Sequence, residues 1–205
     1  MKLIASLHKY VQALEQDFDQ IPAERKQLLQ QLADWARKTK AAGNPLLFNF
    51  ICTHNSRRSH LAQLWAQTAA AYYDVQGVQT YSGGTEATAF NPRAVKAMQA
   101  AGFQIDTLQA GENPVYSVKY AEAAAPVKAW SKKFDDDANP AADFCAVMTC
   151  SDADENCPLV PGVDKRLAIT YNDPKHFDDT PEEVQKYSER VRQIGLEMLY
   201  AFSRV

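Results

Sequence analysis

A β-strand, a loop and an α-helix are predicted in direct succession at residues 46–73, which read LLFNFICTHNSRRSHLAQLWAQTAAAYY. The apolar run ends at Cys52, and Arg58 and Ser59 open the amphipathic helix. Such a junction points backbone N–H groups and the positive end of a helix into one concavity, where a phosphate-like oxyanion fits. The same field favours the thiolate form of Cys52, which is the form that attacks. This segment therefore predicts a reactive thiol beside an anion-binding loop.

Arg58 adds a second group that suits an oxyanion. It stands six positions after Cys52, and its planar guanidinium can grip two oxygens at once, which lysine cannot do. The C-x5-R spacing alone is a weak signal, because a buried cysteine at a strand end is more often a core residue. The surrounding strand, loop and helix favour the catalytic interpretation. The predicted oxyanion loop consists of Thr53, His54, Asn55, Ser56, Arg57 and Arg58.

Three further cysteines follow, Cys145, Cys150 and Cys157. Without a secretory signal, they indicate a reducing cytoplasm, where paired thiols are redox-active or bind metal. Structural zinc sites usually bring cysteines closer together in the sequence than Cys150 and Cys157 are, so we predict a redox pair and no metal. The polar spacer SDADEN favours a mobile loop that can close into a disulfide and reopen, and the alternative is that both cysteines only fill space. We predict that Cys145 is a core residue.

The loop CTHNSRRS resembles the C-T-G-N-S-C-R-S loop of thioredoxin-coupled arsenate reductases, which share the fold of low-molecular-weight protein tyrosine phosphatases. Residues 81–106 are similar to the Y-S-A-G…N-P-A-A-M segment of that family, residues 147–166 to its redox segment, and residues 172–174 to its Asp-Pro loop. The resemblance covers residues 46–109 and 143–202, and the redox segment is its most specific part.

The sequence departs from the family pattern at three positions. His54 stands where the family usually has Gly, and Arg57 where reductases often have Cys. Gln63 stands where some members have a Glu near a cation site.

The resemblance implies two alternative activities. In the reductase, Cys52 attacks arsenate, the loop and Arg58 hold the oxyanion, and Asp173 is the general acid that assists loss of water. Cys150 then attacks Cys52 so that arsenite leaves, and Cys157 attacks Cys150, which leaves a disulfide for a thioredoxin-like reductant. In the phosphatase, the same loop takes a phosphate monoester and forms a phosphocysteine at Cys52 that water hydrolyses.

A third interpretation is a degenerate oxyanion-binding or redox-sensing module, which the intact Cys52, Arg58, Ser59 and Asp173 argue against. Phosphate and arsenate have nearly the same shape and charge, so only the later cysteine pair separates the two enzymes. Without the resemblance, Asp173 before Pro174 would be read as a helix or turn cap.

Composition and charge exclude other classes. The chain has 205 residues, of which 46% are hydrophobic, so it can bury a hydrophobic core. This length fits one domain with additions better than two domains. Its net charge of −3 favours neither nucleic acid nor an acidic membrane as a partner. The opening residues are interrupted by Lys9, Glu15 and Asp17, which fits neither a signal peptide nor a membrane span. We therefore expect a soluble cytoplasmic protein.

Residues 1–45 precede the resemblance and are predicted to form a helical hairpin. Apolar residues at helical spacing mark a first helix near residues 3–18, and Pro22 separates it from a second near residues 28–42. This extension either packs on the core as a brace or offers a homodimer contact, because an amphipathic stripe can bury against either surface.

Residues 46–205 are predicted to form an α/β domain, a central parallel sheet flanked by helices. Strands are expected near residues 78–82, 144–149 and 166–170, with helices at 92–101 and 181–202. An insertion at about 110–142 alternates enough to suggest a β-hairpin from residues 115–121 and 127–134. The three aspartates that follow, 135–137, read as a solvated turn, so we expect no metal and no cofactor.

Overall fold

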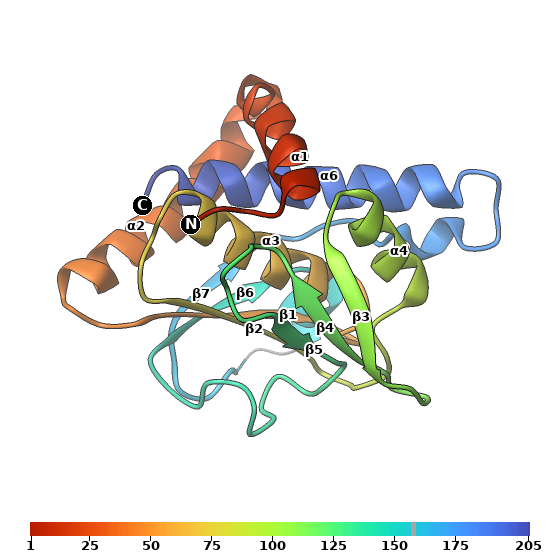
Figure 1. Cartoon of the computed structure of the whole chain (residues 1–205). Coiled ribbons are helices and arrows are strands. Elements are labelled where there is room, and N and C mark those ends of the chain that lie inside the picture. The colour runs from red at the N-terminus through yellow and green to blue at the C-terminus, as the bar shows by residue number, and fades with distance from the viewer. Residues whose placement is uncertain (157–158) are drawn as a thin grey trace.

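The computed structural model describes residues 1–156 and 159–205, so Cys157 lies outside the described residues. Within that range, four parallel strands form the central sheet in the order β2-β1-β6-β7 (Figure 1). They are β1 (Leu46–Cys52), β2 (Val78–Gly84), β6 (Phe144–Met148) and β7 (Val163–Ala168). Every residue of β6 is buried, as expected for a parallel strand that is covered on both faces. The predicted parallel sheet flanked by helices is confirmed.

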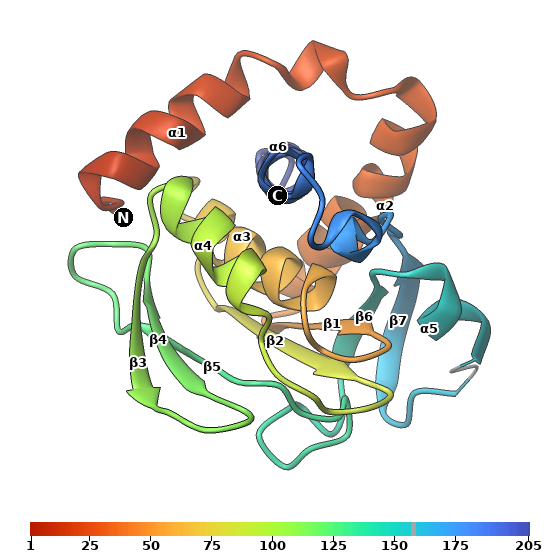
Figure 2. The ribbon, with the colours of Figure 1, turned by 90° about the vertical axis from the view of Figure 1, so that its right-hand side faces the viewer.

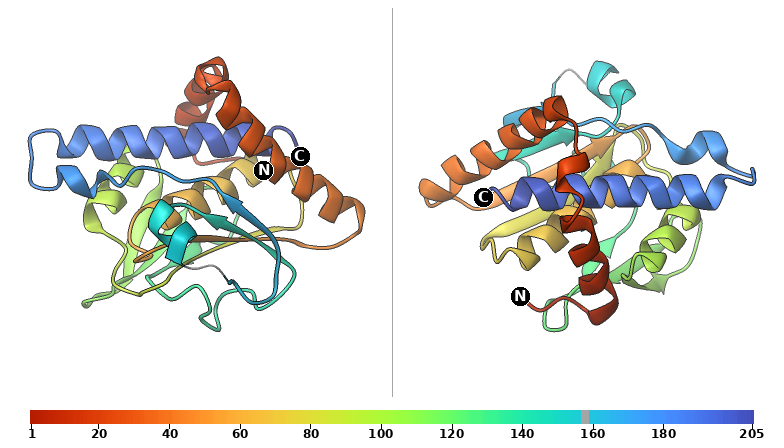
Figure 3. Two further views of the ribbon diagram at one scale, coloured as in Figure 1. Left: turned by 180° about the vertical axis from the view of Figure 1, so that it is seen from behind. Right: turned by 90° about the horizontal axis from the view of Figure 1, so that it is seen from above.

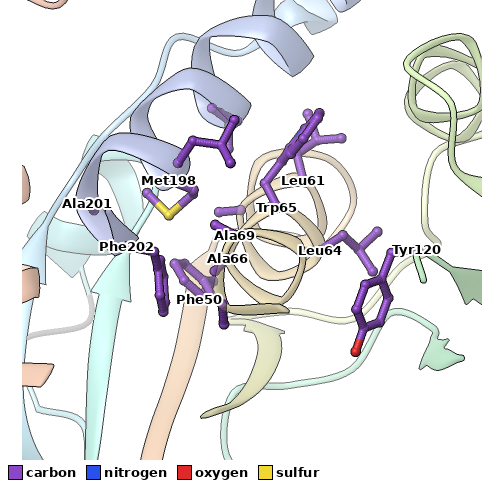
Figure 4. Close-up of a cluster of buried hydrophobic side chains, with 14 of the residues drawn as sticks. Phe50, Leu61, Leu64, Trp65, Ala66, Ala69, Tyr120, Met198, Ala201 and Phe202 are labelled. Carbon is purple, nitrogen blue, oxygen red and sulfur yellow. The ribbon is translucent and has the colours of Figure 1, made fainter. Parts of the chain in front are cut away.

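One face of the sheet is covered by α3 (Arg58–Tyr72) and α6 (Glu183–Phe202), and α4 (Pro92–Ala100) packs beside α6. Figure 4 looks along α3 and shows Phe50 of β1 and Phe202 of α6 on one side of it and Tyr120 on the other. Trp65 of α3 is fully buried in this core. α3 is therefore held from several sides, which fixes the loop at its first turn.

A second, smaller apolar cluster lies on the opposite face of the sheet. It contains Cys52 and Cys150 together with Ile51, Phe144, Ala146, Met148, Ala153 and Val160. Cys145 instead belongs to the larger cluster under α3 and α6. The prediction that Cys145 is a core residue is confirmed, and burial raises the pKa of its thiol.

The N-terminal extension consists of α1 (Ala5–Glu15), a 3-10 turn η1 (Phe18–Gln20) and α2 (Ala23–Ala41). Both helices contact α6, and in Figure 2 they form an arch around it. The arrangement is thus more open than the predicted hairpin, because each helix packs on α6. Leu7, Val11 and Leu14 are buried within the chain, so the apolar stripe of α1 is not free for a dimer contact.

The inserted region pairs with the strand that precedes it in a separate antiparallel sheet of order β3-β4-β5. Its strands are β3 (Gln104–Gln109), β4 (Val115–Lys119) and β5 (Val127–Ala129). The predicted hairpin corresponds to β4 and β5, but β5 is shorter than predicted. The chain after β5 bonds instead to Gly84, whose N–H donates to the Lys132 carbonyl at 2.9 Å. β3 was not predicted, because Ile105 is its one buried residue and it lacks an alternating apolar pattern.

One prediction about the redox segment is wrong. The spacer after Cys150 was expected to be a loop, but Ser151–Asn156 form a short helix, α5, which Figure 3 (left) shows beside β7. Two acidic residues in its first turn, Asp152 and Asp154, favour the helix through its dipole. Arg166 of β7 also lies 2.7 Å from the Asp154 carboxylate. These local contacts outweigh the turn tendency of the polar sequence.

None of the helices in the described ranges is long and apolar enough to cross a lipid bilayer.

Candidate active site

The carboxyl ends of β1, β6 and β7 meet at one edge of the sheet, which is where open parallel sheets bind ligands. Cys52 ends β1, Cys150 follows β6, and Asp173 follows β7. Hydrogen bonds join these ends, since Thr149 Oγ1 donates to the Ile51 carbonyl at 2.9 Å and the Tyr171 N–H donates to the Thr149 carbonyl at 3.1 Å. The topology therefore brings together residues from three distant parts of the chain.

Ser59 is placed to donate a hydrogen bond to the Cys52 sulfur. Its Oγ lies 3.1 Å from Cys52 Sγ and accepts a hydrogen bond of 2.8 Å from Asn55 Nδ2. Because Asn55 supplies a proton to the hydroxyl oxygen, the hydroxyl hydrogen is left to point at the sulfur. The Ser59 hydroxyl is therefore a polar partner of the Cys52 sulfur at the end of β1.

Asn55 shapes the loop as well. Its φ of 43° lies in the left-handed region, which asparagine tolerates better than most residues. The Asn55 Oδ1 accepts a hydrogen bond of 2.9 Å from the Lys132 N–H, so the inserted region braces the loop. His54 has no positive φ, which explains why histidine is accepted where the family usually has glycine.

Gly84 at the end of β2 lets the backbone of the loop approach closely. A Cβ at this position would lie 2.6 Å from the Asn55 nitrogen and 2.7 Å from the Thr53 oxygen. Thr85 and Glu86 then donate backbone hydrogen bonds to the Cys52 and Thr53 carbonyls at 3.1 and 2.8 Å. The loop is thus held from β2 on one side and from Lys132 on the other.

Arg58 is tied to the segment that follows β7. Its Nη1 donates to the Tyr171 carbonyl at 3.0 Å, and its Nη2 donates to Asp173 Oδ2 at 2.7 Å. Arginine has five N–H groups, so this pairing leaves donors for a bound oxyanion.

Asp173 also caps the short 3-10 helix η2 (Pro174–Phe177), because its Oδ1 accepts from the Lys175 N–H at 3.0 Å. The turn-cap interpretation of Asp173 is therefore confirmed, while its role as general acid stays a prediction. One carboxylate oxygen caps a turn, and the other faces Arg58.

Arg57 points away from the predicted oxyanion loop. Its Nε donates to the Tyr187 hydroxyl at 2.7 Å and its Nη2 to Asp178 Oδ2 at 3.0 Å. Tyr187 OH in turn donates to Asp178 Oδ1 at 2.7 Å. The Arg57 side chain therefore fastens the loop to α6 and to the segment after η2, and its Nε also lies 3.9 Å from Asp173 Oδ1.

A cavity of about 490 Å³ opens beside the loop. The basic residues Arg58, Lys175, His54 and His176 share its wall with the carboxylates of Asp152 and Asp173. The remaining lining residues are Thr53, Ser151, Tyr171 and Asn172. Cys52 does not line the cavity, and 3% of this residue is exposed. The structure therefore places the thiol behind the loop that faces the cavity.

Cys150 lies next to the loop. Its Sγ is 3.4 Å from Thr53 Oγ1, and it accepts a hydrogen bond of 3.4 Å from the Ala153 N–H of α5. Cys52, Cys145 and Cys150 are all free thiols. The structure thus brings Cys52, Ser59, Arg58, Asp173 and Cys150 together at one edge of the sheet.

Two buried titratable groups lie behind the loop. Burial lowers the pKa of His60 well below its usual range, and the charge of Lys132 acts in the same direction. Burial also lowers the pKa of Lys132 to about 8, although Asp136 raises it. His60 stacks on Phe90 with ring centroids 4.1 Å apart, so it is a core histidine.

Sequence reasoning missed the supporting residues Tyr171, Asp178, Tyr187 and Lys132. Each acts through tertiary contacts with residues far away in the chain. The sequence signal that could have pointed to Tyr171 was its position directly before the predicted Asp-Pro loop, two residues before Asp173.

Comparison with known proteins shows related sequences. No family model matches the chain. It is 33% identical over 147 residues to the arsenate reductase of Bacillus subtilis, a match that covers 71% of this chain and 87% of that protein. It is 34% identical over 147 residues to the arsenate reductase of Bacillus licheniformis, with the same coverage of 71% and 87%. Arsenate reductase 2 of Staphylococcus epidermidis is 32% identical over 125 residues, 61% of this chain and 76% of the relative.

Solved structures with the same fold are more distant in sequence. The low-molecular-weight protein tyrosine phosphatase from T. tengcongensis has a TM-score of 0.53 at 14% identity and covers 78% of this chain and 99% of its own. The YwlE mutant from Bacillus subtilis has a TM-score of 0.50 at 13% identity, covering 77% and 97%. At these identities the likeness concerns the fold.

Proposed function

Because the chain belongs to the arsenate reductase family, we propose that it reduces arsenate to arsenite through a Cys52 adduct and a relay of three thiols. The observation that carries this proposal is the position of Cys150, whose Sγ lies 3.4 Å from Thr53 Oγ1 in the loop that Cys52 opens. A simple phosphatase needs the thiolate, the arginine and the acid, but has no use for a second thiol at this place.

In the first step, the Cys52 thiolate attacks the arsenic of arsenate. A bond forms between sulfur and arsenic(V), the bond from arsenic to one arsenate hydroxyl breaks, and that hydroxyl leaves as water after accepting a proton from the Asp173 carboxyl. Arg58 and the loop N–H groups hold the remaining oxygens. Ser59 stabilises the thiolate before the attack.

In the second step, the Cys150 thiolate attacks the Cys52 sulfur. A Cys52–Cys150 disulfide forms, the sulfur–arsenic bond breaks, and its electron pair stays on arsenic, which leaves as arsenite. Cys157 then attacks the Cys150 sulfur, so that a Cys150–Cys157 disulfide forms and the Cys52 thiolate is regenerated. A thioredoxin-like dithiol, itself oxidised in exchange, reduces this disulfide. Such a relay requires a reducing compartment such as the cytoplasm, where the disulfide is reduced again after each turnover.

Hydrolysis of phosphate monoesters at the same loop is the alternative activity. Tyr171 is the one aromatic residue among the described lining residues of the cavity, and it is buried. The wall near Cys150 is formed by Ser151 and Asp152. Apart from Tyr171, the described lining offers a phosphotyrosine ring no Phe, Trp or Tyr side chain to stack on, which favours a small inorganic oxyanion.

The experiment that tests the proposal measures thioredoxin-dependent arsenite release and aryl phosphate hydrolysis side by side. Cys52→Ser should abolish both activities, because an alcohol replaces the thiolate. Cys150→Ser and Cys157→Ser should each abolish multiple-turnover arsenate reduction and leave aryl phosphate hydrolysis nearly unchanged. Cys145→Ser, a buried cysteine remote from the loop, is the matched control and should leave arsenate turnover intact. Wild-type rates of arsenite release in both relay variants would refute the relay, and efficient phosphotyrosine hydrolysis without arsenite release would favour the phosphatase.

A further inference from the structure

Arg25 of α2 connects the N-terminal extension to the candidate active site. Its Nε donates to Glu197 Oε2 of α6 at 2.9 Å, and its Nη2 lies 2.8 Å from the same oxygen. The Glu197 side chain is only 4% exposed, and Gln193 donates to its other oxygen at 3.1 Å. A buried carboxylate is stable only when it is paired, so Glu197 fixes the position of the Arg25 guanidinium.

The guanidinium of Arg25 lies over the ring of Tyr171, with Cζ 4.7 Å from the ring centroid. This is within the range of a cation–π contact, which is stronger when the pair is shielded from water. Tyr171 is buried. Burial, and next the charge of Glu197, raise the pKa of Tyr171 well above its ordinary value, so the ring stays neutral. Arg25 of α2, itself held by Glu197 of α6, therefore fixes the position of the Tyr171 ring.

The backbone of Tyr171 is the part that the site uses. Its carbonyl accepts from Arg58 Nη1 at 3.0 Å, and its N–H donates to the carbonyl of Thr149, the residue before Cys150. Asp173 follows two positions later and holds the other end of the Arg58 fork at 2.7 Å. A shift of Tyr171 would therefore move Arg58 and Asp173 together.

We propose that Arg25 is a positioning residue for the oxyanion site, which acts through Tyr171 on the orientation of Arg58. The inference rests on the proposed function in so far as Arg58 must bind an oxyanion. The resemblance to the arsenate reductase family begins at residue 46, so Arg25 belongs to a part of the chain that the family motifs do not include, whereas Tyr171 and Glu197 lie within the resemblance. The extension thus serves the binding site as well as the stability of the fold.

The test compares the affinity of wild type, Arg25→Met and Arg25→Lys for inorganic phosphate by isothermal titration calorimetry, with the arsenate kcat/KM measured in parallel. Small displacements of an oriented binding group cost up to about 100-fold. We expect Arg25→Met to raise the phosphate Kd and lower kcat/KM by about 10- to 100-fold. Arg25→Lys keeps the charge but has no flat face for Tyr171. Its phosphate Kd should therefore lie between those of wild type and Arg25→Met.

Trp35→Phe is the matched control on the same helix. Trp35 Nε1 donates to Asp164 Oδ2 at 2.6 Å, near the start of β7 and thus at the opposite edge of the sheet from the site. The Trp35→Phe substitution removes one contact between the extension and the sheet. The phosphate Kd of this variant should stay within about twofold of wild type. Thermal melting identifies variants that are merely destabilised.

Arg25→Met with a lowered melting temperature and an unchanged phosphate Kd would overturn the inference, since a purely structural residue behaves in this way. If Arg25→Met does not fold, a wild-type Kd in Arg25→Lys overturns it instead. Because phosphate binding needs no turnover, a wild type that binds phosphate but releases no arsenite would contradict the proposed function and leave this inference to be decided by the Kd values.

Discussion

At the scale of single residues, the surroundings of a cysteine decide what its sulfur can do. Cys52 and Cys145 are both buried, but Cys145 lies among apolar side chains and its thiol pKa is raised by burial. Cys52 has Ser59 Oγ at 3.1 Å, and Asn55 orients that hydroxyl. The residue type and its burial alone would not separate Cys52, the proposed nucleophile, from the core residue Cys145.

Asp173→Asn tests the general acid. The amide oxygen can still accept from the Lys175 N–H and cap η2, but the side chain can no longer supply a proton. Arsenate reduction should fall by roughly 10²–10⁴-fold, the usual contribution of a general acid. Asp152→Asn removes another carboxylate of the same cavity and should have a much smaller effect on the rate.

Hydrolysis of aryl phosphates gives a second measurement, because the loss should be greater for poor leaving groups. Small and equal losses for good and poor leaving groups would make Asp173 a structural turn residue.

Lys132 should make stability depend on pH in the alkaline range. Its folded pKa is lowered by burial to about 8, below the ordinary value of 10.5 that applies to the unfolded chain. Between these two values the unfolded chain binds more protons, so the free energy of unfolding should rise with pH. We expect a rise of about 1–2 kcal/mol between pH 7.5 and pH 9.5.

Urea unfolding at several pH values measures this rise, and Lys132→Met provides the reference. The difference between wild type and Lys132→Met cancels the other titrating groups, among them the tyrosines, whose raised pKa values act above pH 10. A constant difference across this range would mean that the Lys132 ammonium is well solvated in the folded protein.

At the scale of elements, α5 must open if the relay operates. A helix over Ser151–Asn156 rises about 9 Å, whereas the two Cα atoms of a disulfide lie roughly 4.4–6.8 Å apart. Six helical residues are marginal in isolation, so the cost of opening is small. The Asp154 N–H donates to the Cys150 carbonyl at 3.1 Å in the closed form, and oxidation should break this bond.

Amide hydrogen exchange measures this opening. The amides of Ala153 and Asp154 should be protected in the reduced protein and exchange rapidly after oxidation, while α4 is unchanged. Cys157→Ser cannot form the Cys150–Cys157 disulfide and should keep its protection in the same oxidant. Protection that persists in oxidised wild type would show that the two cysteines do not pair.

Elements with a strong local pattern could be predicted from the sequence. The run LLFNFIC predicted β1 because six of its seven residues are apolar, and α6 was predicted at residues 181–202 and observed as Glu183–Phe202. β3 could not be predicted because it exposes most of its side chains, and α5 was missed because its helix depends on contacts with Cys150 and Arg166. The site residues within the motifs could be named, but the direction in which Arg57 points depends on Tyr187 and Asp178, which are more than 100 positions away.

At the scale of the whole molecule, the extension and α6 depend on each other. Met198, Ala201 and Phe202 of α6 pack on α3 and β1 (Figure 4), while α1 and α2 pack around α6 (Figure 2). α6 therefore has the sheet and α3 on one side and the arch of the extension on the other. The candidate site lies at the edge of this three-layered arrangement, where Tyr171 and Tyr187 join the loop to the helices behind it.

The packing of α1 and α2 around α6 also bears on the order in which parts of the protein can fold. Arg25 and Glu197 are 172 positions apart in the chain, and Asp17 and Arg192, which also form an ion pair, are 175 apart. Contacts between such distant residues close the longest loops, so they form slowly and late in folding. During synthesis, α1 and α2 emerge first but must wait for α6 before they can dock. If Arg25 orients Arg58 as proposed, a newly made chain would complete its oxyanion site only after α6 has been synthesised and the extension has docked on it.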